Sequence, residues 1–152
     1  MDEYQGVRYS LAACLQAQGR DDELAELLHR FDDEESAYWL FTRVLWRYRG
    51  EGSSRRATSE LKDAIEAHPH VPLYLLGRKH FLVGGLSRSV DSEGESAGVT
   101  YFIGGIHHWL KTPGALEWVR ENADEKRLAQ LERGSASWSL PDAAALNAPG
   151  AG

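Results

Sequence analysis

The chain has 152 residues, a length that fits one domain with a modest core. Charged residues make up 26% and hydrophobic residues 42%, which is the ordinary composition of a soluble globular protein. The formal net charge is −6, with 17 Lys and Arg against 23 Asp and Glu. This surplus of negative charge argues against binding to nucleic acid or to an anionic lipid surface.

Two further features bear on the cellular compartment. Cys14 is the only cysteine, so an intrachain disulfide is impossible, and this fits a reducing cytosol. No apolar run approaches the roughly 20 residues that span a bilayer, and the acidic start "MDEYQGVRYS" is not a signal peptide. We therefore expect a soluble, cytoplasmic protein.

The first predicted element is a helical hairpin. Residues 3–18 form its first helix, with Gly19 as the stop, and Asp21 is expected to cap the second helix. The apolar stripe of the first helix is expected at Val7, Leu11, Cys14 and Leu15. The stripe of the second helix is expected at Leu24, Leu27, Leu28 and Phe31. On this pattern Cys14 is a buried thiol rather than a nucleophile.

A second hairpin follows. Asp32 and Glu35 resemble a capping box before an aromatic-rich helix at about 34–49. The turn "GEGSS" separates this helix from a fourth one in "RRATSELKDAIEAH". The apolar face of the fourth helix is expected at Ala57, Leu61, Ala64 and Ile65.

The two hairpins indicate an internal repeat. Leu24, Leu28 and Phe31 align with Ala57, Leu61 and Ala64 at an offset of 33 residues. The tetratricopeptide repeat has a period of about 34 residues, and a proline follows its second helix. Pro69 takes that place in the second hairpin, whereas Ser36 stands there in the first. The sequence therefore predicts an all-α protein of about two tetratricopeptide-like hairpins, with an unrelated helical bundle as the alternative.

The stretch "AHPHVPLYLLG" is predicted to join these hairpins to C-terminal helices. Pro69 ends one helix, Pro72 opens a short one, and Gly77 follows its end. The histidines can hydrogen-bond helix-end carbonyls. After a loop at 78–91, Ser92 and Glu95 suggest a cap for a helix that ends near residue 110.

The C-terminal part is predicted to be helical and then disordered. The stripe of the helix to residue 110 is expected at Val99, Phe102, Ile103, Ile106 and Trp109 or Leu110. Its glycines lower its intrinsic stability or mark close packing. Thr112 is expected to cap, and Pro113 to open, a last helical segment in one or two pieces. This gives a single domain at 1–133 and a disordered tail at 134–152.

Three phrases carry a family resemblance: "GVRYSLAACLQAQGRDDELAELLHRF", "AHPHVPLYLLGRKH" and "HHWLKTPGALEWV". In order and spacing they resemble the soluble, tetratricopeptide-like region of the suppressor of tumorigenicity protein seven family and its bacterial relatives, over residues 4–120. The resemblance implies a helical-repeat fold without an established enzymatic activity. The animal members are membrane-associated, a feature that we do not carry over to this chain. An upstream region usual in the bacterial relatives is expected to be absent.

The histidines allow an alternative function, a small metal-dependent hydrolase. His68 and His70 would point to one side of an extended segment, and His107 or His108 would be the third ligand. A zinc site needs three or four ligands, so we prefer the structural reading of these histidines. We expect no cofactor and no bound metal.

A basic strip is the candidate partner-binding site. Arg43 and Arg47 are i, i+4 neighbours on the third predicted helix, and Arg8 lies on the first. These helices are expected to line the concave face of the repeat, where the arginines could bind a carboxylate or an acidic peptide. The alternative is that they pair with Glu34, Glu35 or Asp63 on the surface.

The sequence thus predicts a non-enzymatic protein that binds another protein or a peptide. Repeat arrays usually need at least three units or caps, and the helices after Pro72 are expected to supply the cap. If they leave the second hairpin uncovered, its aromatic face would form a homodimer. A third alternative is a degenerate family copy without a partner.

Overall fold

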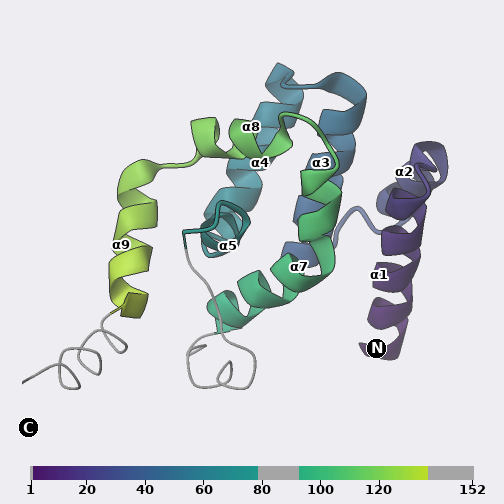
Figure 1. The fold of residues 1–152 in the computed structure, drawn as a ribbon. Helices are drawn as coiled ribbons and strands as arrows, with labels where there is room; N and C mark the ends of the chain where they lie inside the picture. Colours follow the sequence, from purple (N-terminus) through teal and green to yellow (C-terminus); the bar gives the residue numbers. More distant parts are fainter. Residues whose placement is uncertain (1, 79–92, 137–152) are drawn as a thin grey trace, which may run out of the picture.

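The computed structural model describes residues 2–78 and 93–136. Within these ranges the chain forms eight α-helices and no strand, which confirms the all-α prediction (Figure 1). The helices are α1 (Asp2–Ala17), α2 (Asp21–Arg30), α3 (Ala37–Glu51), α4 (Arg55–Ala67), α5 (Val71–Leu75), α7 (Glu93–Leu110), α8 (Ala115–Asn122) and α9 (Glu125–Ala136). None of these described helices is long and apolar enough to cross a membrane. The predicted loop beyond Arg78, the Ser92 cap and the tail beyond residue 136 lie outside the described residues.

The two predicted hairpins are present and lie side by side, α1–α2 next to α3–α4 (Figure 1). α1 ends as predicted, because Gly19 has a φ of 70° and the amide of Arg20 donates to the Leu15 carbonyl (2.9 Å). The predicted cap at Asp21 is wrong. Asp21 is already the first residue of α2, and its carboxylate instead forms an ion pair with Arg49 (3.0 Å).

The predicted stripe of α1 is wrong except at Leu15. Val7 and Leu11 are 66% and 46% exposed, and Cys14 is also exposed rather than buried. The inward face instead carries Ala12, Leu15 and Gln16, which are at most 5% exposed. A small alanine lets the backbones of packed helices approach closely, so it competes successfully for the buried face with larger apolar residues.

The cap of α3 is Ser36 rather than Asp32. The Ser36 hydroxyl accepts a hydrogen bond from the amide of Trp39 (3.3 Å), and α3 begins three residues later than predicted. This register places Trp39 at 0% exposure in the core between the two hairpins. Ser54 caps α4 in the same way, accepting from the amide of Ala57 (3.0 Å). The predicted α4 face is confirmed, with Ala57, Leu61 and Ala64 buried and Ile65 half-buried.

The joint after α4 is confirmed. Pro72 lies in the first turn of α5, whose five residues are all buried. Gly77 has a φ of 73°, and the amide of Arg78 donates to the Leu73 carbonyl (2.9 Å), which closes the helix. His68 ends α4, and its Nε2 lies 2.8 Å from the Glu35 carbonyl, just before α3 begins.

α7 packs against α1, α3 and α5, and its glycines mark close packing. A Cβ on Gly98 would lie 3.3 Å from the backbone of His70, and one on Gly105 would lie 2.7 Å from the ring of Tyr101. The predicted stripe is wrong at Ile103, which is 57% exposed, and of the two alternatives at its end Trp109 is buried whereas Leu110 is 66% exposed. The packed face of α7 instead carries Tyr101 and Trp109, which are both buried.

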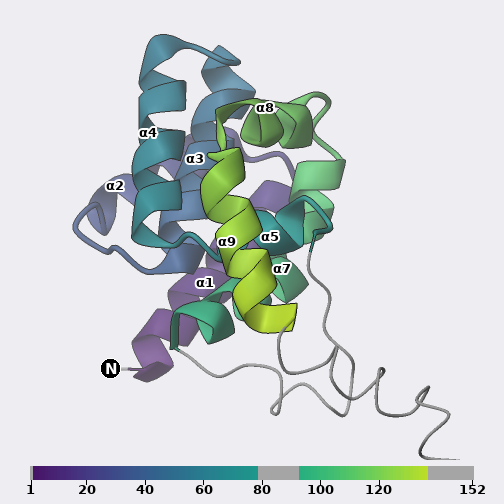
Figure 2. The same cartoon turned by 90° about the vertical axis from the view of Figure 1, so that its left-hand side faces the viewer.

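The C-terminal helices cover the second hairpin. One core cluster joins residues of α3, α4, α5, α7 and α8, so the condition for a dimer through an uncovered aromatic face is not met. Figure 2 shows α9 in front of α5, against which it packs. The predicted start of α8 is wrong: Gly114 precedes its first residue, and the Thr112 hydroxyl instead closes α7 by donating to the His108 carbonyl (2.9 Å). α9 runs through residue 136, so residues 134–136 are helical rather than part of a tail.

Candidate peptide-binding groove

Arg8 has its charge neutralised inside the first hairpin. Its guanidinium donates to the carboxylate of Glu34 and lies over the ring of Phe31, 4.1 Å from the centroid. The second oxygen of Glu34 accepts from Tyr9, and burial together with this carboxylate raises the pKa of Tyr9 to about 12. The pairing matches the alternative that the sequence left open for this arginine.

Arg43 and Arg47 lie in one cleft of about 460 Å³ between α2, α3 and α4. Arg47 donates to both oxygens of Glu60 (3.0 and 2.9 Å), which raises the pKa of its guanidinium, and it lies 3.7 Å from Glu51. Arg43 donates to the backbone carbonyl of Asp32 (3.3 Å), and no carboxylate of the described residues forms an ion pair with it.

The cleft lies on the opposite side of α3 from α7. Residues two apart in a helix point about 200° apart, and Leu45, between the two arginines, belongs to the core that α7 completes. α7 packs on the face shared by α1 and α3, whereas Arg43 and Arg47 line the cleft between α2, α3 and α4 on the other side of α3. Whether the three arginines bind a partner stays a prediction.

The histidines of the metal-site alternative are not brought together. His70 packs against Gly98 on α7, and His107 lies nine residues further along the same helix, roughly 13 Å at the α-helical rise. The described residues contain no group of three or more His, Cys, Asp or Glu that could hold a metal ion. His107 is exposed and its ring packs on that of His108, 3.9 Å between centroids.

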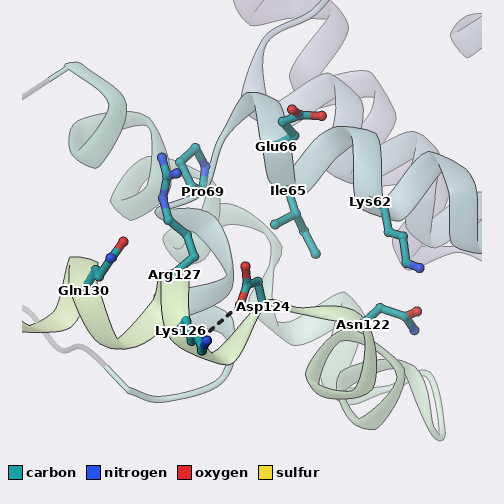
Figure 3. Close-up of a pocket in the computed structure, with 9 residues that line it drawn as sticks. All are labelled: Lys62, Ile65, Glu66, Pro69, Asn122, Asp124, Lys126, Arg127 and Gln130. Carbon is teal, nitrogen blue, oxygen red and sulfur yellow. Dashed lines mark hydrogen bonds between the residues drawn. The ribbon is translucent and has the colours of Figure 1, made fainter.

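A second hollow, which the sequence did not indicate, lies between α4 and α9 (Figure 3). It has a volume of about 410 Å³. One wall comes from the second half of α4 and the following proline, and the other from the last residue of α8, the link to α9 and the first turns of α9. The lining residues are Lys62, Ile65, Glu66, Pro69, Asn122, Asp124, Lys126, Arg127 and Gln130. We call this hollow the α4–α9 groove.

The α4–α9 groove has an apolar side and cations around it. Figure 3 shows Ile65 pointing from α4 toward Asp124, while Arg127 extends from α9 toward Pro69 and Lys62 points toward Asn122. Lys62, Lys126 and Arg127 are exposed, and none forms an ion pair with a carboxylate of the described residues. Such cations carry charge that a ligand can neutralise.

The two acids of the groove compensate these cations only partly. One carboxylate oxygen of Asp124 accepts a hydrogen bond from the amide of Lys126 (3.0 Å) and so caps α9. Glu66 points away from Asp124 in Figure 3. The groove thus carries three cations against two acids, in a protein whose formal net charge is −6.

The far wall of the groove is held by α5. Leu128 is buried against Leu73 and Tyr74, which fixes α9 on α5. Arg78 donates to Glu125 (2.6 Å), the first residue of α9, and to Glu132 (2.8 Å), two turns later on the same helix. These hydrogen bonds raise the pKa of Arg78, and the contact with Arg78 lowers the pKa of Glu125. The groove is therefore a fixed feature of the packing of α9.

Comparisons with known proteins find a similarity to Suppressor of tumorigenicity 7 proteins. The chain is 31% identical over 124 residues to Suppressor of tumorigenicity 7 protein-like of Danio rerio, an alignment that covers 70% of this chain and 22% of the relative. It is also 30% identical over 124 residues to the Suppressor of tumorigenicity 7 proteins of Macaca fascicularis and Rattus norvegicus. Both alignments cover 70% of this chain, and they cover 23% of the Macaca fascicularis protein and 21% of the Rattus norvegicus protein. The chain thus spans about a fifth of the length of these curated relatives. No protein-family model and no solved structure matches the chain.

The chain is therefore an all-helical protein similar to one part of Suppressor of tumorigenicity 7 proteins. None of the relatives named above carries the name of an enzyme. The tetratricopeptide-like character of the hairpins and the link to bacterial relatives stay predictions.

Proposed function

We propose that this chain is a non-enzymatic helical protein, built on two tetratricopeptide-like hairpins, that binds an acidic peptide segment of a partner protein in the α4–α9 groove. The observation that carries the proposal is the set of three exposed cations, Lys62, Lys126 and Arg127, without ion-pair partners among the described residues, around an apolar side chain.

The chemistry of the groove fits an extended acidic segment. Ile65 and Pro69 offer apolar contact area, and removing it from water contributes roughly 25 cal/mol per Å². Asn122 and Gln130 carry amides, although the Asn122 amide nitrogen already donates to the Trp118 carbonyl (2.9 Å). The guanidinium of Arg127 can hold a carboxylate by two parallel hydrogen bonds. Charge steers such a ligand, and the apolar side contributes affinity.

The cleft of Arg43 is a second candidate surface for the same function. Trp46 and Leu28 give it apolar walls, and Arg43 is the only one of its two arginines without a carboxylate partner among the described residues. Its neighbours Asp32 and Glu60 are acidic, so an acidic ligand is favoured less there than in the α4–α9 groove.

A peptide array tests the proposal directly. Short acidic, neutral and basic peptides are screened against the purified chain, and the best acidic peptide is titrated by fluorescence anisotropy. We expect binding that weakens with salt, because exposed charges are screened. Arg127→Gln should weaken it by about tenfold or more, since a hydrogen bond to a charged group contributes about 1.5–3 kcal/mol.

Arg133→Gln is the matched control, because Arg133 is exposed on the same helix but does not line the groove. It should leave the affinity unchanged. Equal effects of the two variants, or no preference for acidic peptides, would refute the α4–α9 groove as the site. A loss confined to Arg43→Gln would place binding in the cleft between α2 and α4.

A further inference from the structure

A further hollow lies between the ends of three helices, and it shares no lining residue with the α4–α9 groove. Its volume is about 720 Å³, which falls within the roughly 300–1,000 Å³ of small-molecule sites. It opens between the end of α1, the last turn of α3 and the residues that follow α7. Asp21, the first residue of α2, also lines it. We call it the α1–α3–α7 hollow.

Two cations of the α1–α3–α7 hollow have N–H groups that are left for a ligand. No carboxylate within residues 2–78 and 93–136 forms an ion pair with Lys111. The guanidinium of Arg49 lies 3.0 Å from Oδ1 of Asp21, yet this enclosed oxygen accepts no hydrogen bond, so the N–H groups of Arg49 are not directed at it. Burial lowers the pKa of His108, and so do the charges of Lys111 and Arg49, which therefore lie around the same imidazole. Both cations can donate to one carboxylate.

The end of α1 presents acceptors to the same hollow. Gln16 is 5% exposed, and its amide nitrogen donates to the Ala12 carbonyl over a long 3.4 Å. Its Oε1 accepts no hydrogen bond from the described part of the chain and is not enclosed by protein atoms, so it faces the hollow that Gln16 lines. Buried acceptors usually have a donor, and here a ligand can supply it. α1 ends at Ala17, and the C-terminal end of a helix carries partial negative charge that favours a cation.

We propose that the α1–α3–α7 hollow binds a free α-amino acid. The carboxylate of the ligand accepts from Lys111 and Arg49, and its ammonium group donates to Oε1 of Gln16 and to Asp21. The lining carries two cations and one carboxylate, and the end of α1 adds partial negative charge, so a zwitterion fits better than a dianion such as phosphate. Because the hollow is separate from the α4–α9 groove, this inference does not rest on the proposed function.

Binding is measured on the full chain with each of the standard amino acids, first by saturation-transfer NMR and then by calorimetry for the best ligand. At least one amino acid should bind. Lys111→Gln should weaken it by about tenfold or more, because a hydrogen bond to a charged group is lost. Arg133→Gln is the matched control, since Arg133 is exposed on α9 and does not line the hollow. Binding of no amino acid, or equal effects of the two variants, would overturn the proposal.

A second variant tests the acceptor side without removing a charge. Gln16→Met keeps an unbranched side chain of similar shape, so the variant should fold, which circular dichroism checks. It should weaken binding by about fivefold or more, because the ammonium group loses Oε1. An affinity equal to that of the wild type would refute the assigned role of Gln16.

Blocked analogues of the best amino acid separate a zwitterion site from a simple anion site. The N-acetyl derivative lacks the ammonium charge and the amide derivative lacks the carboxylate, so both should bind at least about tenfold more weakly than the free amino acid. Inorganic phosphate should not displace the amino acid. Equal binding of the N-acetyl derivative, or displacement by phosphate, would indicate a site for anions in general and overturn the proposal.

Discussion

Two adjacent glycines of α7 are expected to respond to alanine in opposite directions. A Cβ on Gly105 would lie 2.7 Å from Cζ of Tyr101, whereas one on Gly104 would lie 3.5 Å from Cε2 of Tyr38, an ordinary contact distance. Helix propensity alone predicts the same stabilisation of about 1 kcal/mol for both substitutions. The difference between them therefore isolates the packing of α7.

The Tyr101 ring cannot move aside cheaply. It is 2% exposed, and its hydroxyl accepts a hydrogen bond from Nε1 of Trp109 (2.6 Å), which is itself 1% exposed. Overpacking of this kind costs about 1–3 kcal/mol, and the loss of the hydrogen bond adds about 1 kcal/mol. Gly105→Ala should therefore lower the free energy of unfolding by about 1–3 kcal/mol after the propensity gain. Gly104→Ala should raise it by about 0.5–1 kcal/mol.

Urea denaturation followed by circular dichroism measures both variants, with equal m-values as the check that unfolding remains comparable. In heat denaturation each kcal/mol corresponds to a shift of about 2–4 °C for a chain of this size. Stabilisation by both substitutions, or destabilisation by both, would refute the close approach of the Tyr101 ring to Gly105, one turn later on α7.

Two further predictions concern the ends of helices and pH. Ser54→Ala should lower the free energy of unfolding by about 1 kcal/mol, because the amide of Ala57 loses the hydroxyl that caps it. Ser53 is exposed and lies one residue before the cap, so Ser53→Ala should have little effect in the same urea denaturation assay. His108 is 3% exposed, and burial together with the nearby cations of His107, Lys111 and Arg49 lowers its pKa from 6.5 to about 4. The unfolded chain therefore binds a proton at higher pH than the folded chain, and the stability from His108 is lost as pH falls from about 6.5 toward 4. Between pH 7 and pH 5 this loss of stability is at most about 2 kcal/mol. The loss should disappear in the His108→Gln variant. The control variant His29→Gln should retain it, because His29 is exposed. An identical pH dependence in wild type and His108→Gln would contradict the burial of this imidazole.

The helices could be predicted because their signals are local. Gly19 and Gly77 adopt the positive φ that ends a helix, and Pro72 begins one, so each boundary depends on a residue or two. Which face of a helix is buried depends on residues that are distant in the sequence. α1 is apolar or small on most sides, so hydrophobic periodicity could not distinguish the stripe of Leu11 from the buried face of Ala12.

The cap of α3 shows a different limit. Asp32 and Ser36 both have side chains that can cap, and the choice depends on where Trp39 packs between the hairpins. The exposed residues of α7 were mispredicted for a related reason. Gly98 lies against His70, which precedes α5, and this contact with a segment distant in the sequence sets the rotation of α7.

The α4–α9 groove could not be predicted from the sequence. Lys62 and Arg127 are separated by more than sixty residues, and lysines and arginines on helices are usually solvated surface. Arg43 and Arg47 attracted attention because they are neighbours on one helix. Sequence spacing does not reveal that Glu60 of the next helix pairs with Arg47.

Amide hydrogen exchange with and without the best acidic peptide tests the central claim most directly. Binding in the α4–α9 groove should slow exchange in the second half of α4 and at the start of α9, around residues 62–69 and 122–130. The effect should be lost in Arg127→Gln and kept in Arg133→Gln. Protection confined to α2 and the start of α3, or no protection at a peptide concentration that saturates the anisotropy signal, would contradict the account.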